Sequence, residues 1–290
     1  MFTVPLKLLT LGLDIKKMNF ELPFIPERTV PPRQKGLTMM MDKGLSFRES
    51  EDFISASGHI TDIVKFGFGT AFVTNDLQKK IDLYKEAGIK PYFGGTLFES
   101  FYARGMVEDY LRVLDKFNLE LAEISDGSII MNHNEKCELI HRFSKERTIM
   151  SEVGSKDSGI IVSPSKWVKM MSTELQAGSW KVIAEGREAG NVGVFRPNGS
   201  AHTYLINKII SKVDPGDILW EAPQKNQQVW FIKLFGANVN LGNIGPNEMI
   251  PLECLRLGLR GDTFFDFLPT DYADRLRQVN DENVEEEEEV

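Results

Sequence analysis

Charged side chains stand inside short apolar segments of this 290-residue chain, where a soluble protein seldom places them. Eight of them lie near the ends of different segments: the acids Asp42, Glu123, Glu152, Glu185 and Glu221, and the bases Lys65, Lys156 and Arg187. Several carboxylates without a histidine cluster favour a hard cation such as Mg²⁺ over zinc. A lysine beside that cation could exchange a proton with a carbon acid or form a Schiff base. These residue types predict a site for a small anionic substrate.

Alternation along the segments predicts that these charges share one side of a sheet, because successive side chains of a strand point to opposite faces. In KVIAEGREAG (181–190), Glu185 and Arg187 share a face with Ile183, and Val182 and Ala184 take the other face. The alternation holds in the other segments as well. The charges are therefore expected to converge in the interior of a sheet that helices cover on its outer side.

The first segment is assigned in the same way. Its alternation directs Met40 and Asp42 inward and Met39 and Met41 outward. Geometry then favours Glu152, Glu185 and Glu221 as metal ligands, with Asp42 and Glu123 completing the candidate set. A structural lattice of salt bridges inside an inert barrel remains the alternative interpretation.

Other side chains are candidates for holding the substrate. Lys65 and Arg187 suit its anionic groups, because a guanidinium can bind a carboxylate, phosphate or sulfonate through two hydrogen bonds. The loop NVNLGNIGP (238–246) offers Asn240, Gly242 and Asn243 with backbone N–H groups for a phosphate. His133 follows a strand end and is a further candidate.

The segments that carry these residues repeat one order, a short apolar strand followed by a loop and an amphipathic helix. Eight strands are expected, at 37–44, 62–71, 90–97, 120–128, 148–156, 181–190, 217–223 and 235–244. Eight strand–helix units spaced by about thirty residues predict an α/β fold of the (β/α)8 TIM-barrel type, whose sites lie at the mouth formed by the carboxyl ends of the strands. An open doubly wound sheet is the alternative, but no GxGxxG or Walker motif supports a nucleotide-binding fold.

The chain ends differ from this central region. Residues 1–35 are Pro-rich and predict an extended arm, residues 36–270 the barrel, and residues 271–290 a disordered acidic tail. Much of the net charge of −8 lies in this tail, so the charge says little about partners, and no basic stripe indicates nucleic acid. No apolar run is long enough for a membrane span, and two cysteines suit a reducing compartment. We expect a cytoplasmic homo-oligomer.

Several motifs together resemble the phosphosulfolactate synthase family, which includes related plant heat-stress-associated proteins. They are DKG (42–44), DIVKFGFGT (62–70), PYFGGTLFE (91–99), EISDGS (123–128), SEVGSK (151–156) and EGREAGNVGVF (185–195). The resemblance covers roughly residues 35–267, which is the whole expected barrel. The arm and the acidic tail lie outside the family pattern and indicate a divergent branch.

The resemblance implies a reaction, namely the Mg²⁺-dependent addition of sulfite to phosphoenolpyruvate, which gives 2-phospho-3-sulfolactate on the route to coenzyme M. The lysine of SEVGSK matches the proton donor of the family, which assigns that role to Lys156, with Glu152 as its catalytic companion. Two alternatives stay open. One is a lyase or isomerase of another small phosphorylated carboxylate, and the other is a non-catalytic, stress-associated barrel protein.

Overall fold

A single eight-stranded parallel sheet forms the centre of the computed structural model, which describes residues 19–154, 162–187 and 189–276. Its strands are β1 (Thr38–Asp42), β2 (Ile63–Phe66), β3 (Lys90–Phe93), β4 (Leu121–Ile124), β5 (Thr148–Val153), β6 (Ser179–Ala184), β7 (Ile218–Glu221) and β8 (Leu241–Ile244). The first strand pairs with the last as well as with β2, as a barrel requires and an open doubly wound sheet does not. The predicted (β/α)8 barrel is confirmed.

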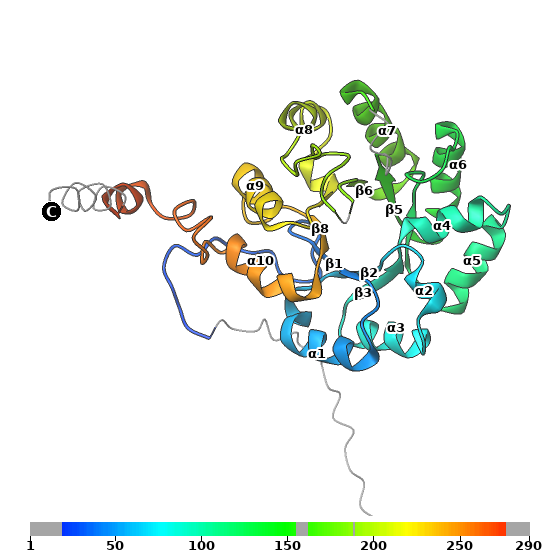
Figure 1. Ribbon diagram of the computed structural model, residues 1–290, viewed down its shortest axis with the longest axis horizontal. Coiled ribbons are helices and arrows are strands. Elements are labelled where there is room, and N and C mark those ends of the chain that lie inside the picture. The colour runs from blue at the N-terminus through cyan, green and yellow to red at the C-terminus, as the bar shows by residue number, and fades with distance from the viewer. Residues whose placement is uncertain (1–18, 155–161, 188, 277–290) are drawn as a thin grey trace, which may run out of the picture.

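Helices surround the strands on the outside (Figure 1). They are α1 (Phe47–Ser57), α2 (Thr70–Val73), α3 (Leu77–Glu86), α4 (Gly95–Tyr102), α5 (Val107–Lys116), α6 (His133–Phe143), α7 (Pro164–Ala177), α8 (Thr203–Ile210), α9 (Lys225–Phe235) and α10 (Met249–Arg256), with the 3-10 helices η1 (Gly58–Ile60), η2 (Pro215–Asp217) and η3 (Pro246–Glu248). Helix α7 begins as its sequence indicates, with the Ser163 side chain accepting from Lys166 N and Pro164 in the first position. Within the described part of the chain, no helix combines the length and apolarity that a membrane crossing requires.

Two separate apolar cores follow from the alternation of the strands. The larger core lies between strands and helices, and the smaller one fills the barrel interior with Leu37, Met39, Ile63, Tyr92, Leu121, Met150, Ile183 and Leu219. This arrangement confirms the predicted inward faces of β2, β4, β5, β6 and β7. The prediction for β1 is wrong, because Met39 belongs to the interior core and Met40 to the outer one. The sequence assignment took Asp42 as the polar residue that marks the inward face, but Asp42 pairs with Lys80 of α3 in the helix layer.

One junction of the barrel is closed by side chains. Strands β3 and β4 are the two ends of the hydrogen-bonded strand order, so no backbone ladder joins them in the described sheet. The Tyr92 hydroxyl of β3 donates to Glu123 Oε2 of β4 at 2.8 Å, and Gly95 N donates to Glu123 Oε1 at 2.7 Å. Glu123 therefore bridges the junction from the β4 side.

The described part of the N-terminal arm packs at the end of the barrel where the strands begin. Arg28 Nε lies 2.9 Å from Glu253 Oε1 of α10, and Arg33 Nη1 lies 3.0 Å from Asp62 Oδ1, just before β2. At the other end of the chain, residues 270–276 are helical, and the Tyr272 ring lies 5.4 Å from the Phe24 ring between centroids. Residues 1–18 of the expected arm and 277–290 of the expected acidic tail lie outside the described residues.

Candidate active site

The ammonium group of Lys65 lies among three carboxylates at the mouth of the barrel. Its Nζ is 3.1 Å from Glu123 Oε2, 3.2 Å from Glu221 Oε1 and 3.5 Å from Glu152 Oε2. The four side chains come from β2, β4, β5 and β7, and at most 6% of any of them is exposed. The sequence prediction that these charges converge from separate strands is confirmed.

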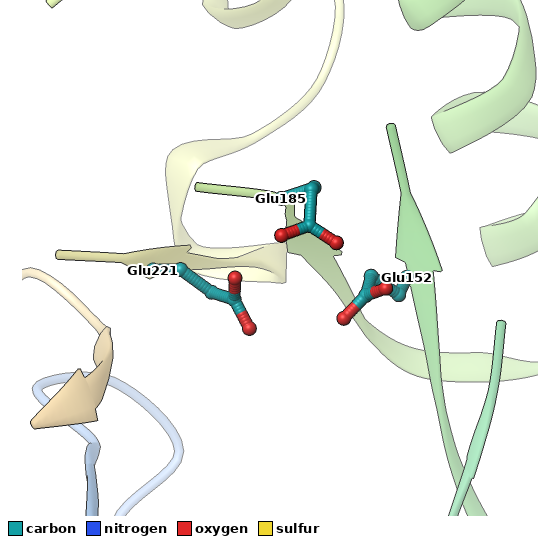
Figure 2. A group of neighbouring side chains, drawn as sticks. All are labelled: Glu152, Glu185 and Glu221. Atoms are coloured by element: carbon teal, nitrogen blue, oxygen red, sulfur yellow. The ribbon is translucent and has the colours of Figure 1, made fainter. Parts of the chain in front are cut away.

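A group of three carboxylates lies within this cluster. One oxygen from each of Glu152, Glu185 and Glu221 lies within 4.8 Å of the other two, and all three residues are buried. Figure 2 shows the side chains, carried by β5, the end of β6 and β7, turned toward one another. Such close buried carboxylates repel one another unless cations neutralise them. The group therefore has the donor type and spacing of a site for a hard divalent cation.

The turn after β6 supplies backbone donors to these carboxylates. Gly186 N donates to Glu221 Oε2 at 3.1 Å, and Arg187 N donates to Glu221 Oε2 at 3.2 Å and to Glu185 Oε1 at 2.6 Å. Arg187 has a positive φ of 60°, which brings its N–H into this turn. A Cβ on Gly193 would come 1.9 Å from the Glu185 carbonyl oxygen, so a glycine is needed where the loop closes over the turn.

Charge balance decides what the cluster can hold. Among the described residues, the carboxylates of Glu123, Glu152, Glu185 and Glu221 gather around the ammonium of Lys65, so carboxylates outnumber this cation. Burial alone would lower the pKa of Lys65, but the carboxylates of Glu123, Glu221 and Glu152 raise it well above its ordinary value. Lys65 therefore stays a cation at neutral pH. A divalent ion fits the remaining negative charge.

Glu123, which contacts Lys65, is itself held in place by hydrogen bonds from β3 and from the start of α4. Tyr92 donates its hydroxyl proton to this carboxylate, and burial together with the Glu123 charge raises the pKa of Tyr92 well above its ordinary value. Tyr92 therefore remains a neutral donor. A Cβ on Gly95 would lie 2.4 Å from Glu123 Oε1, which requires the smallest residue at that position.

Asp42 lies outside this cluster, and its prediction as a metal ligand is wrong. Its Oδ2 is 2.6 Å from Lys80 Nζ and accepts from the Tyr84 hydroxyl at 2.9 Å, both on α3. Its Oδ1 accepts from the backbone N–H groups of Gly44 and Leu45. Asp42 lies on the face of β1 opposite to the one assigned from sequence, so its buried carboxylate points to the helix layer.

The phosphate-loop candidates separate along β8. Asn240 comes immediately before the first residue of this strand, at the end of the barrel opposite the mouth. Its side chain forms hydrogen bonds there with Leu37 N, Gly216 O and Ile218 O, so its prediction as a mouth residue is wrong. A Cβ on Gly242 would lie 2.5 Å from Met39 Cε, in the interior core. Asn243 has a φ of 57° and is 5% exposed, and its Oδ1 is buried without a hydrogen-bond partner among the described residues. Only Asn243 keeps a position suited to a ligand.

Three further predictions have different outcomes. The Arg187 side chain is exposed although its backbone N–H lies in the site. His133 begins α6 and its Nε2 lies 2.7 Å from Thr173 Oγ1 of α7, so it belongs to the helix layer. Lys156 falls in 155–161, outside the described residues.

Sequence reasoning missed several residues of the site region. Tyr92 shares the inward parity of Lys90 and Gly94 in KPYFGG, so the alternation could have found it. Ser125 donates a hydrogen bond to Glu99 of α4, and both are buried. Pairing between a strand end and a distant helix leaves no periodic signal in the sequence.

Comparison with known proteins gives one consistent result. A family model described as (2R)-phospho-3-sulfolactate synthase (ComA) matches residues 26–262. The chain is 40% identical over 244 residues to phosphosulfolactate synthase of Bacillus subtilis (strain 168), covering 83% of this chain and 97% of that protein. It is 42% identical over 237 residues to phosphosulfolactate synthase of Methanocaldococcus jannaschii, covering 80% and 94%.

Solved structures support the fold alone. The crystal structure of 3-hexulose-6-phosphate synthase from Salmonella typhimurium is similar with a TM-score of 0.51 and 12% sequence identity, covering 77% of this chain and 100% of that one. The cluster at the mouth of the barrel consists of Lys65, Glu123, Glu152, Glu185 and Glu221. All five residues lie within residues 26–262, which the family model matches.

Proposed function

This chain belongs to the (2R)-phospho-3-sulfolactate synthase family, and we propose that it is a lyase that adds sulfite to phosphoenolpyruvate in the presence of Mg²⁺. The observation that carries the proposal is the group of Glu152, Glu185 and Glu221 at the mouth of the barrel, with Lys65 beside it. The product would be 2-phospho-3-sulfolactate, which places the reaction in coenzyme M biosynthesis.

Glu152, Glu185 and Glu221 would hold the Mg²⁺. Their oxygens lie within 4.8 Å of one another, and oxygen-only coordination suits this hard cation. When bound, Mg²⁺ would supply the positive charge that stabilises negative charge developing on the substrate carboxylate. Without a divalent ion the excess of carboxylates in the cluster would repel two anionic substrates.

The reaction forms one bond and needs no oxidant or reductant. The sulfur lone pair of sulfite forms a C–S bond to the methylene carbon of phosphoenolpyruvate, and the electron pair of the C=C bond moves toward C2 and the carboxylate. A proton delivered to C2 then completes the product. The resemblance of SEVGSK to the family motif assigns that proton to the Lys156 ammonium, with Glu152 in the same motif.

Lys65 acts in this proposal as a fixed cation. Its raised pKa keeps the nitrogen protonated, which argues against Schiff-base formation because that step needs the neutral amine. Its three carboxylate contacts orient the ligands Glu152 and Glu221. The exposed guanidinium of Arg187 and the Nδ2 donor of the Asn243 side chain are the groups we assign to the substrate phosphate or sulfonate.

The test is consumption of phosphoenolpyruvate by purified full-length protein, followed by phosphorus NMR. With Mg²⁺ we expect consumption only when sulfite is present, and we expect Lys156→Ala to slow it by about 100-fold or more. No consumption with any divalent metal would refute the proposal. Turnover of other phosphorylated carboxylates without sulfite would instead support a different barrel lyase or isomerase.

A cytoplasmic location and homo-oligomeric assembly belong to the same proposal. In support of assembly, Phe72 and Val73 of α2 are 85% and 75% exposed, and exposed apolar side chains favour subunit contacts. Light scattering coupled to size-exclusion chromatography measures the assembly directly, and a monomer at micromolar concentration would contradict it.

A further inference from the structure

A fully buried lysine lies outside the barrel, directly behind the proposed metal site. Lys136 of α6 is 0% exposed, and its Nζ donates to the backbone carbonyl of Glu152 at 2.6 Å. The same Nζ lies 2.8 Å from Asp126 Oδ1, in the loop after β4, and 3.0 Å from Glu174 Oε1 of α7. One ammonium therefore joins β5 to the β4 loop and to two helices.

The bond to Glu152 lies where the backbone ladder ends. Strands β4 and β5 pair as far as Ile124 and Ser151, so Glu152 is one residue beyond the last pair on that side. Its carbonyl therefore has no ladder donor from β4, and the Lys136 ammonium donates to it instead. On the other side of β5, the Val153 carbonyl still accepts from Glu185 N.

The position of Lys136 is unfavourable for a lysine in two respects. Burial of an ammonium is costly, and this one stands in the first turns of α6, where the positive end of the helix dipole repels it. Replacing a buried ion pair by apolar residues of similar volume is often neutral or stabilising. Stability alone therefore gives no reason for the charge at this position.

We propose that Lys136 is a positioning residue, which fixes the end of β5 so that the Glu152 carboxylate stays directed at Glu185 and Glu221. The inference rests on the proposed function, because it assumes that these three carboxylates bind a divalent cation. Residues that orient metal ligands typically change metal affinity by about 10–100-fold when they are replaced.

The test replaces both charges at once in the full-length protein, as Lys136→Met with Glu174→Gln, so that neither remains buried without its partner. The readout is Mn²⁺ affinity by isothermal titration calorimetry, with folding checked by circular dichroism. We expect the double variant to fold and to bind Mn²⁺ at least about 10-fold more weakly than the unmodified protein. Should it not fold, the single variant Glu174→Gln removes only the anchor of Lys136 on α7 and is expected to weaken binding less.

The matched control is a second buried pair on the outer face of the sheet. Lys80 Nζ lies 2.6 Å from Asp42 Oδ2, with side chains 2% and 0% exposed, and contacts the Leu45 carbonyl rather than that of a proposed ligand. Lys80→Met with Asp42→Asn should lower thermal stability and leave Mn²⁺ affinity within about twofold. The inference would be overturned if both double variants lost Mn²⁺ affinity equally. It would also be overturned if Mn²⁺ affinity were unchanged in Lys136→Met with Glu174→Gln or, should that variant not fold, in Glu174→Gln.

Glu152→Gln separates this inference from the proposed function. If Glu152→Gln abolishes Mn²⁺ binding while the Lys136 variants leave it unchanged, the metal site stands and the positioning role is wrong. If Glu152→Gln binds Mn²⁺ normally, the proposed metal site is itself wrong.

Discussion

Replacing Lys65 by methionine removes a cation that contacts Glu123, Glu152 and Glu221. Methionine keeps the length of the side chain and leaves its packing against the strands in place. Glu123, Glu152 and Glu221 would then each lose the ammonium that contacts them in the metal-free protein. We therefore expect the Lys65→Met variant to be strongly destabilised when no metal is bound.

The size of the effect follows from the distances. Two unit charges 3.2 Å apart, as for Lys65 Nζ and Glu221 Oε1, attract by about 5 kcal/mol at an effective dielectric constant of about 20. Burying the ammonium offsets part of this attraction, and removing one partner of a buried pair costs about 3–5 kcal/mol in practice. That range is a large share of the roughly 5–15 kcal/mol by which a folded protein is stable.

The measurement is urea unfolding of the unmodified protein and Lys65→Met, each with EDTA and with saturating Mg²⁺. Mg²⁺ should stabilise the variant by more than it stabilises the unmodified protein, because the ion neutralises charge that Lys65 no longer balances.

One result would refute this reasoning. If Lys65→Met in EDTA unfolds within about 1 kcal/mol of the unmodified protein, and Mg²⁺ adds nothing extra, the cluster does not carry the charge described here. Lys65→Arg is the control, because it keeps the cation; it should retain most of the stability that the methionine variant loses.

Three further predictions test other parts of the site and fold. Glu185→Gln should weaken Mn²⁺ binding by about 10-fold or more in calorimetry, and an unchanged affinity would remove this residue from the proposed ligand set. Gly95→Ala should lower the free energy of unfolding by about 1–3 kcal/mol and reduce turnover, since the new Cβ would lie 2.4 Å from Glu123 Oε1; wild-type behaviour in both assays would contradict the close approach. Arg28 holds the pKa of the Glu253 carboxyl below its ordinary value, although burial of the carboxyl opposes this. The negative charge of Glu253 therefore stabilises the fold above a pH of about 4, and this stabilisation is lost in more acidic solution as the carboxyl is protonated. Glu253→Gln should therefore cost about 1–3 kcal/mol at neutral pH, and chemical unfolding should show the difference shrinking below pH 4, whereas a difference that persists in acid would oppose this account.

The sequence allowed most of the barrel to be predicted, because strand alternation and strand–helix spacing are both local properties. Glu123, Glu152, Glu185 and Glu221 could be placed at the mouth for the same reason, since each is an acid at or next to the end of its strand and shares the parity of the apolar residues that point inward. In β1 the same reasoning assigned Asp42 to the wrong face, because this acid pairs with Lys80 in the helix layer.

Other parts of the site depend on where strands end relative to their neighbours. Asn240 was predicted at the mouth because it was assigned to a loop that follows the last strand, whereas it precedes β8, which begins at Leu241. The contact of Lys136 with the Glu152 carbonyl depends on a ladder that stops at Ile124 and Ser151. A single sequence does not encode pairing register in any local pattern, so neither feature could have been predicted.

The link that Glu123 forms across the junction of β3 and β4 limits how this mouth can change. The carboxylate that faces Lys65 also receives the Tyr92 hydroxyl and the Gly95 amide, so the wall of the barrel is fastened by part of its own reactive centre. A designer who wishes to fit another anion would weaken the wall by altering Glu123. Arg187 and Asn243 hold no strands together through their side chains in the contacts described, and they are the places where new specificity could be introduced at little cost to folding.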